Sequence, residues 1–175
     1  DAGMERQVKP QVLSTFGDLA LAIGPRFLKY LPIVLPLLQQ AFCTIVDVED
    51  YDSIDFLNEL REGVFEAYTG IIQGLKGSAG NANDLAIVQD HFRNVVQFLD
   101  LISGDAHASD SLLAAACGLI GDMLTAFGVG FLPLVDREPV TELLNHARRS
   151  KVQKTRTLAM WASKEIKKLK NSAAA

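Results

Sequence analysis

The octapeptide GDLALAIG at residues 17–24 returns in varied form as GIIQGLKG at 70–77 and GDMLTAFG at 121–128. Each copy is a glycine, six residues and a second glycine, and the copies start 53 and 51 residues apart. That period accommodates two helices and a loop, which is typical of HEAT-like or armadillo-like repeats. The second glycine of each copy is placed to end a helix, and the first is small enough to let two helices approach closely.

The first and third copies match over a longer stretch than the glycines alone. FGDLALAIG at 16–24 aligns with IGDMLTAFG at 120–128, and Phe27-Leu28 aligns with Phe131-Leu132. These two parts of the chain are therefore expected to form equivalent structural units.

Hydrophobic residues elsewhere recur at steps of three and four, which predicts amphipathic helices. The predicted helices cover about 8–23, 26–44 with a kink at Pro36, 54–75, 84–102, 109–127, 139–148 and 151–169. No segment alternates apolar and polar residues over the length of a strand. We therefore expect an all-α protein, an α-α superhelix of the HEAT/armadillo-like solenoid type. Its helix pairs would span about 8–44, 50–104 and 109–149, followed by a terminal helix at 151–170, all within one domain at 1–175.

Charge is unevenly distributed along the chain. Residues 148–170 hold nine bases against Glu165 alone, whereas residues 1–146 hold twenty acids against eight bases. An acidic body favours basic protein partners and repels the phosphates of nucleic acid. The basic tail by itself could still contact an acidic surface.

The cysteines and the apolar runs indicate in which cellular environment the protein is found. Cys43 and Cys117 lie in apolar stretches without further ligands at metal-binding spacing, which predicts reduced, buried thiols. The longest apolar runs, 30–38 and 112–120, are shorter than the roughly 20 residues of a membrane helix. We expect a soluble cytosolic or nuclear protein. Because the sequence opens in the middle of a pattern, we interpret it as part of something longer.

Several blocks of sequence resemble the C-terminal end of the importin-β (karyopherin-β) family of nuclear import receptors. The blocks are VKPQ at 8–11 running into FGDLALAIG at 16–24, LNELRE at 57–62, EAYTGIIQGLKG at 66–77, GLIGD at 118–122, and RRSK at 148–151 with WASKE at 161–165. The resemblance implies a superhelix of HEAT repeats whose inner surface wraps the importin-β-binding segment of importin-α, or a cargo. It also implies that the outer surface binds Phe-Gly nucleoporins and that Ran binds mainly through regions outside this chain.

A dense acidic run precedes and enters the third predicted helix. It consists of Asp47, Glu49, Asp50, Asp52 and Asp55, and is continued on the helix by Glu59, Glu62 and Glu66. These carboxylates are candidate partner-binding residues for a Lys/Arg-rich segment. The alternative is a solvated linker whose acids stabilise a helix N-terminus. The run lacks the glycine and terminal glutamate of a calcium loop, so we expect no metal there.

Trp161, the only tryptophan, lies beside the stripe formed by Leu158, Ala162, Ile166 and Leu169 on the last helix. A partly exposed indole there is a plausible anchor for a partner, and the alternative is a core residue. The resemblance implies that the matching Trp packs on the bound helix of the importin-β-binding segment. The lysines of the same helix, Lys164, Lys167, Lys168 and Lys170, favour a polar cap on the solenoid over a membrane or nucleic-acid site.

Residues and resemblance together predict a segment of a nuclear transport receptor that binds basic import signals. We expect a monomer without catalytic residues, metal or cofactor, acting in the cytoplasm, the nucleus and at the nuclear pore complex of the nuclear envelope. The expected partners are importin-α, basic cargo, Phe-Gly nucleoporins and the Ran GTPase, with no membrane and no nucleic acid. The alternative is a HEAT-repeat scaffold of another multiprotein complex, and an enzyme ranks third.

Overall fold

The computed structural model describes the backbone of residues 2–77 and 82–174 and the side chains of residues 9–77 and 85–174. Within those ranges every regular element is a helix and none is a strand, which confirms the all-α prediction. The chain divides into two compact units, Asp1–Asp84 and Leu85–Ala175, and each is considered by itself.

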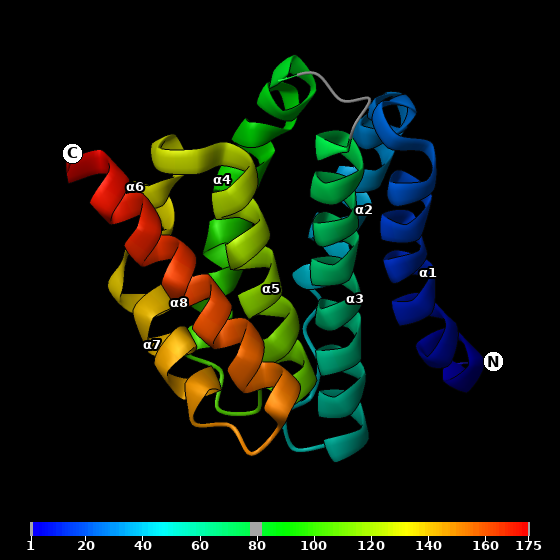
Figure 1. The fold of residues 1–175 in the computed structure, drawn as a ribbon. Coiled ribbons are helices and arrows are strands. Elements are labelled where there is room, and N and C mark those ends of the chain that lie inside the picture. Colours follow the sequence, from blue (N-terminus) through cyan, green and yellow to red (C-terminus); the bar gives the residue numbers. More distant parts are fainter. Residues whose placement is uncertain (1, 78–81, 175) are drawn as a thin grey trace. The chain divides into compact units, whose positions relative to one another are not determined.

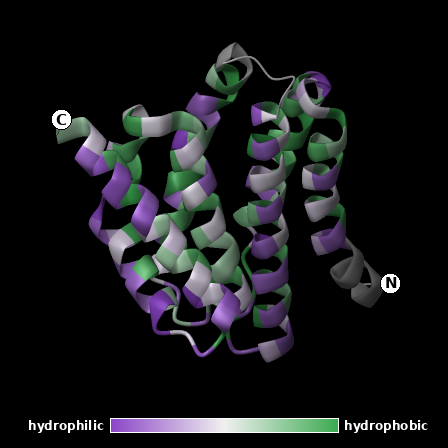
Figure 2. Cartoon of the chain, in the orientation of Figure 1, coloured by the Kyte–Doolittle hydropathy of each residue, from purple (hydrophilic) through white to green (hydrophobic). Residues whose placement is uncertain are grey.

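The part of the first unit that the structure describes forms three α-helices and one 3-10 helix, and Figure 1 shows how they are arranged. They are α1 (Ala2–Ile23), the 3-10 helix η1 (Gly24–Tyr30), α2 (Leu31–Phe42) and α3 (Tyr51–Lys76). Hydrophilic and hydrophobic residues alternate in bands along α3, as expected of a helix with one buried face (Figure 2).

The second unit is built around α5. Its elements are α4 (Ala82–Ser103), α5 (Asp110–Phe127), the 3-10 helix η2 (Gly128–Phe131), α6 (Leu132–Val135), α7 (Glu138–Arg148) and α8 (Gln153–Ala174). Helix α5 packs against both α7 and α8. Thr155 at the start of α8 is fully buried and donates its hydroxyl hydrogen to the carbonyl oxygen of Asp110, 3.0 Å away. Arg137 and Asp100 form a two-pronged ion pair, with N···O distances of 3.0 and 2.8 Å.

Helices α1 and α3 approach each other backbone to backbone (Figure 1). A Cβ atom placed on Gly70 would overlap the backbone of Gly17, lying 2.5 Å from its carbonyl oxygen. One placed on Gly63 would lie 2.6 Å from the carbonyl oxygen of Pro10, and Gly74 meets α1 in the same way. The first glycine of the repeated octapeptide thus allows a close helix approach in two of its copies, as predicted.

The second glycine ends a helix in all three copies, which confirms that prediction. Helices α1, α3 and α5 stop immediately before Gly24, Gly77 and Gly128. Gly24 and Gly128 have φ angles of +57° and +65°, which residues with a side chain rarely adopt. Each of these two glycines begins a 3-10 helix, so the first and third copies are equivalent in structure as well as in sequence.

The prediction of a single α-helix over 26–44 is wrong. The structure has η1 over the first part and α2 only from Leu31 to Phe42. Pro25 and Pro32 both lie at the first positions of these elements. Proline carries no N–H and fits a first turn but not a helix interior, so each proline marks a new start. The short pieces η2 and α6, at 128–135, were not predicted either.

Two helical stretches, Lys9–Phe42 and Asp110–Val135, are long and apolar enough to cross a membrane by length and composition alone. The first of them is interrupted at Gly24, where α1 ends. In the second, 56% of the most apolar window is buried inside the protein. Core helices of soluble proteins pass the same test, so these stretches carry little weight as membrane spans.

Glycines 17, 63, 70 and 74 form a seam, the line along which the backbones of α1 and α3 are in contact. Substituting Gly70 in this seam should lower the stability of the protein. We expect Gly70→Ala to lower the free energy of unfolding by about 3 kcal/mol, the upper end of typical overpacking costs, because the clash is with backbone and no side chain can yield. Gly118 in α5 is a matched control, since a Cβ there meets nothing within 4 Å. Gly118→Ala should stabilise by about 0.5–1 kcal/mol through helix propensity. Urea unfolding of both variants measures the difference, and equal effects would contradict a tight seam.

The two thiols should differ in reactivity and in their effect on alkaline stability. Burial raises the pKa of Cys117 from 9.0 to about 12, whereas Cys43 is exposed. We expect a thiol reagent to modify Cys43 and to spare Cys117 until the protein unfolds. Above pH 9.0 the unfolded chain releases the Cys117 proton and the native state keeps it, so stability should fall from there toward pH 12. Unfolding curves of wild type and Cys117→Ala across that range test the sign, since the variant should lose less.

Candidate protein-binding surfaces

The acidic run lies in the loop before α3 and on the first turns of that helix, and all five of its members are exposed, as is Glu59. Asp50 is the N-cap of α3, accepting hydrogen bonds from the Asp52 amide at 3.2 Å and the Ser53 hydroxyl at 2.5 Å. Asp47 accepts one from the Glu49 amide at 3.0 Å. Asp50 therefore stabilises the N-terminus of α3, as the alternative interpretation of these acids expects, while Asp55 and Glu59 are exposed on α3.

Four of the acids form a stripe along α3. Asp55, Glu59, Glu62 and Glu66 follow one another at steps of four, three and four residues, which places them on one side of a helix. The last three line a groove of about 230 Å³ between α3 and α1. Its other lining residues are Pro10, Gln11, Ser14 and Gly63. The groove has a wall of carboxylates on α3 and small polar groups on α1, an arrangement suited to ammonium or guanidinium groups.

Trp161 lies half-buried on α8, with its six-membered ring against Gly121 of α5. A Cβ atom on Gly121 would overlap that ring. The first glycine of the third repeat copy therefore accommodates an indole, where the first copy accommodates the backbone of α3. The contact gives Trp161 a packing role on one side and leaves part of the side chain exposed. Trp161 and the acidic stripe belong to different units.

Two of the tail lysines are engaged in ion pairs. The Nζ of Lys170 lies 2.8 Å from Oδ1 of Asp136, and the Nζ of Lys168 lies 3.5 Å from Oε2 of Glu165. Lys164 and Lys167 are exposed. Among the described residues no group of three or more His, Cys, Asp or Glu side chains is arranged to hold a metal ion.

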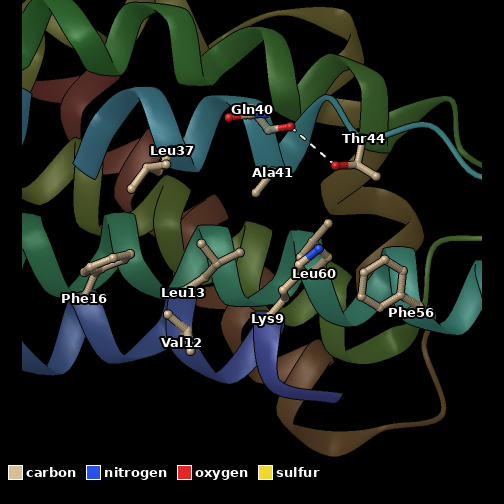
Figure 3. Close-up of a pocket in the computed structure, with 10 residues that line it drawn as sticks. All are labelled: Lys9, Val12, Leu13, Phe16, Leu37, Gln40, Ala41, Thr44, Phe56 and Leu60. Carbon is tan, nitrogen blue, oxygen red and sulfur yellow. Dashed lines mark hydrogen bonds between the residues drawn. The ribbon is translucent and has the colours of Figure 1, made fainter. Parts of the chain in front are cut away.

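An apolar groove that sequence reasoning missed lies between α1 and α2 (Figure 3). Its volume is about 440 Å³, and Figure 3 shows side chains of both helices pointing into it. Val12, Leu13, Phe16, Leu19, Ala20 and Ile23 recur at steps of one, three and four residues in the sequence, which by itself predicts one apolar stripe on this helix. The structure divides them, because Leu13 and Ala20 are buried while Val12, Leu19 and Ile23 are exposed. Two apolar faces on α1 are the signal that a single-stripe interpretation overlooks.

Closely packed helices, a repeated glycine pattern and an acidic groove between α1 and α3 define a helical-repeat protein. Residues 1–148 match the family model of importin subunit beta-1-like TPR repeats. The chain belongs to this importin-β family.

Relatives and solved structures agree with that assignment. The chain is 36% identical over 94% of its length to importin subunit beta-1 of Schizosaccharomyces pombe, and 32% identical over 93% to that of Arabidopsis thaliana. A crystal structure of importin beta in an ammonium sulfate condition superposes with a TM-score of 0.86 over 93% of the chain at 32% identity. That neighbour confirms the HEAT-repeat solenoid class. The chain spans 19% of the length of each of these three proteins.

Other similar structures carry partners. A Kap95:Nup1 complex has a TM-score of 0.78 and 27% identity over 95% of this chain, and 19% of Kap95 is covered. A structure of Kap95p with RanGDP has a TM-score of 0.79, again at 27% identity.

Removing the indole should separate packing from binding. We expect Trp161→Ala to lower the free energy of unfolding by less than the about 3–5 kcal/mol of a fully buried aromatic, because the ring is only half-buried. If the exposed part anchors a partner, affinity should fall by about 2 kcal/mol in addition. Met160→Ala, at an exposed neighbouring position, is the control. Thermal melts of both variants measure the change in stability, and titration calorimetry with the partner measures the change in affinity. If folded Trp161→Ala protein binds the partner as tightly as the wild type, Trp161 has a packing role only.

Proposed function

We propose that this chain is a segment of a nuclear transport receptor and that it binds Lys/Arg-rich import signals. The observation that carries the proposal is the groove lined by Glu59, Glu62 and Glu66 between α1 and α3. Membership of the importin-β family supports it, because the relatives bear the name of an import receptor subunit. The occupant that best fits this groove is the basic importin-β-binding segment of importin-α, or the basic segment of a cargo.

Electrostatics favours capture of such a segment over tight binding at any one residue. A single exposed ion pair contributes only about 0–1 kcal/mol. Several carboxylates on one stripe produce a field that speeds encounter with a basic peptide and repels acidic ones. Specific affinity then needs an apolar contact. Within the second unit, we propose the exposed part of Trp161 as a separate apolar anchor.

Nucleoporins and Ran are further proposed partners. Kap95 binds Nup1 and RanGDP in the similar structures. This chain covers 19% of Kap95, so the same interactions are proposed for a whole receptor that contains this chain. In the proposed function the protein works in the cytoplasm, the nucleus and at the pore between them. The rival function is a HEAT-repeat scaffold of another complex, which would not require an acidic groove.

Peptide binding should depend on salt and on the groove. We expect a Lys/Arg-rich peptide to bind markedly more weakly at 1 M salt than at 0.1 M, since the Debye length shrinks from about 10 Å to about 3 Å. Replacing Glu59, Glu62 and Glu66 by Gln together should weaken binding at low salt, because the groove loses its carboxylates. A control variant with Asp90→Asn, Glu138→Gln and Glu142→Gln removes the same charge from the other unit. Calorimetry measures the peptide affinity of both triple variants. Equal affinities would mean that net charge, and not the groove, determines binding. If the peptide does not bind at either salt concentration, the scaffold function is favoured.

A further inference from the structure

Ser150 lies in the loop at 149–152 that joins α7 to α8. Three exposed bases flank it directly, because Arg148 and Arg149 precede it and Lys151 follows it. The same stretch begins the basic tail that the charge distribution of the sequence sets apart from the acidic body. The loop lies in the second unit and the acidic groove in the first, so its bases have no part in that groove.

Ser150 differs from the other hydroxyl residues of the basic tail in its backbone. The stretch 148–174, which the structure describes completely, contains five hydroxyl side chains, and Ser150 alone lies outside a helix. Thr155 is fully buried, and Thr157, Ser163 and Ser172 lie inside α8. An enzyme that modifies a side chain needs the backbone around it in an accessible form, so a hydroxyl inside α8 is reached only after local unfolding. The loop residue Ser150 needs no such step.

The hydroxyl of Ser150 connects two helices. Its Oγ donates a hydrogen bond to Oδ1 of Asp110, on the first turn of α5. The same Oγ accepts the amide hydrogen of Val152, 2.9 Å away, immediately before α8 begins. The carbonyl oxygen of Ser150 accepts a hydrogen bond from Nη1 of Arg156 at 2.7 Å. One half-buried side chain therefore ties the start of α8 to the start of α5.

We propose that Ser150 is a phosphorylation site for a protein kinase that selects bases on both sides of its acceptor, and that the phosphate releases the loop from α5. Exposed Arg148, Arg149 and Lys151 attract a kinase whose substrate groove is acidic. In the transfer, Oγ of Ser150 attacks the γ-phosphorus of ATP and a new O–P bond forms. The bond from the γ-phosphorus to its bridging oxygen breaks, ADP leaves, and the hydroxyl proton passes to a carboxylate of the kinase.

The phosphate has opposite effects on the two contacts of this side chain. On the α5 side it removes the hydrogen that Ser150 donates and places a charge of about −1.5 to −2 beside the Asp110 carboxylate, which repels it. On the α8 side a phosphate oxygen can still accept the Val152 amide hydrogen, and an anion is stabilised at the N-terminus of a helix. Phosphorylation therefore shifts the loop from α5 toward α8.

Labelling of the folded chain tests the site. Incubation with magnesium-ATP and the catalytic domain of protein kinase C, which prefers bases around its acceptor, should place one phosphate on Ser150, located by mass spectrometry of the peptides. We expect Ser150→Ala to slow phosphate incorporation at least about tenfold, because the hydroxyls that remain in the basic tail require local unfolding. Ser163→Ala is the matched control and should leave the rate unchanged, since Ser163 lies next to Lys164 but inside α8.

The melting temperature tests the release of the loop. Phosphorylated wild type should melt about 2–4 °C below the unphosphorylated protein, the shift expected when a chain of this size loses one ordinary hydrogen bond. Asp110→Asn is the matched control, because its amide accepts the Ser150 hydrogen as the carboxylate does and also donates to a phosphate without repelling it. Scanning calorimetry should therefore find that phosphorylation does not lower the melting temperature of Asp110→Asn.

Each part of the proposal has an outcome that overturns it. Phosphate found on another residue, or incorporated only into the unfolded chain, would mean that Ser150 is not the site. Equal melting temperatures of phosphorylated and unphosphorylated wild type would mean that the loop stays in contact with α5. An equal fall in wild type and Asp110→Asn would mean that repulsion by Asp110 is not the cause. None of these measurements involves a basic peptide, so this proposal and the proposed function can fail independently.

Discussion

The close approach of α1 and α3 sets the geometry of the first unit. Glycines at 17, 63, 70 and 74 bring the two backbones into contact, and no larger residue fits at these positions. Each glycine inside a helix costs about 1 kcal/mol relative to alanine, so the seam forms only because packing offsets that cost. The polar groove follows from the seam, because Glu59, Glu62 and Glu66 flank the glycine line on α3 and Ser14 flanks it on α1.

The first glycine of the repeated octapeptide contacts different groups in the two units. Gly17 is in contact with the backbone of Gly70, whereas its counterpart Gly121 is in contact with the ring of Trp161. A glycine in the repeat therefore provides space, and the neighbouring helix decides whether backbone or an aromatic side chain fills it. This explains how a repeat of constant pattern can vary the separation of its helices from one copy to the next.

Much of the fold follows from local chemistry that the sequence displays. Gly24 and Gly128 end α1 and α5 through their own backbone freedom at positive φ, so their positions in the sequence were sufficient to place those ends. The break at Leu31 was missed because apolar spacing continues through Pro32 even though the hydrogen-bond ladder does not. The carboxylates of the acidic run are evident in the sequence, but which of them line a groove depends on α1. The contact of Trp161 with Gly121 joins residues 40 positions apart and cannot be read from either helix alone.

The aromatic residues are divided between the units in a way that makes each unit optically distinct. All three tyrosines, Tyr30, Tyr51 and Tyr68, lie in the first unit, and the single tryptophan lies in the second. The indole rests on Gly121, so its emission reports directly on whether α8 remains seated on α5. Every tyrosine contribution to the near-ultraviolet spectrum comes from the first unit. The protein thus carries two built-in chromophores whose separate or coincident melting would reveal whether its halves lose their structure together.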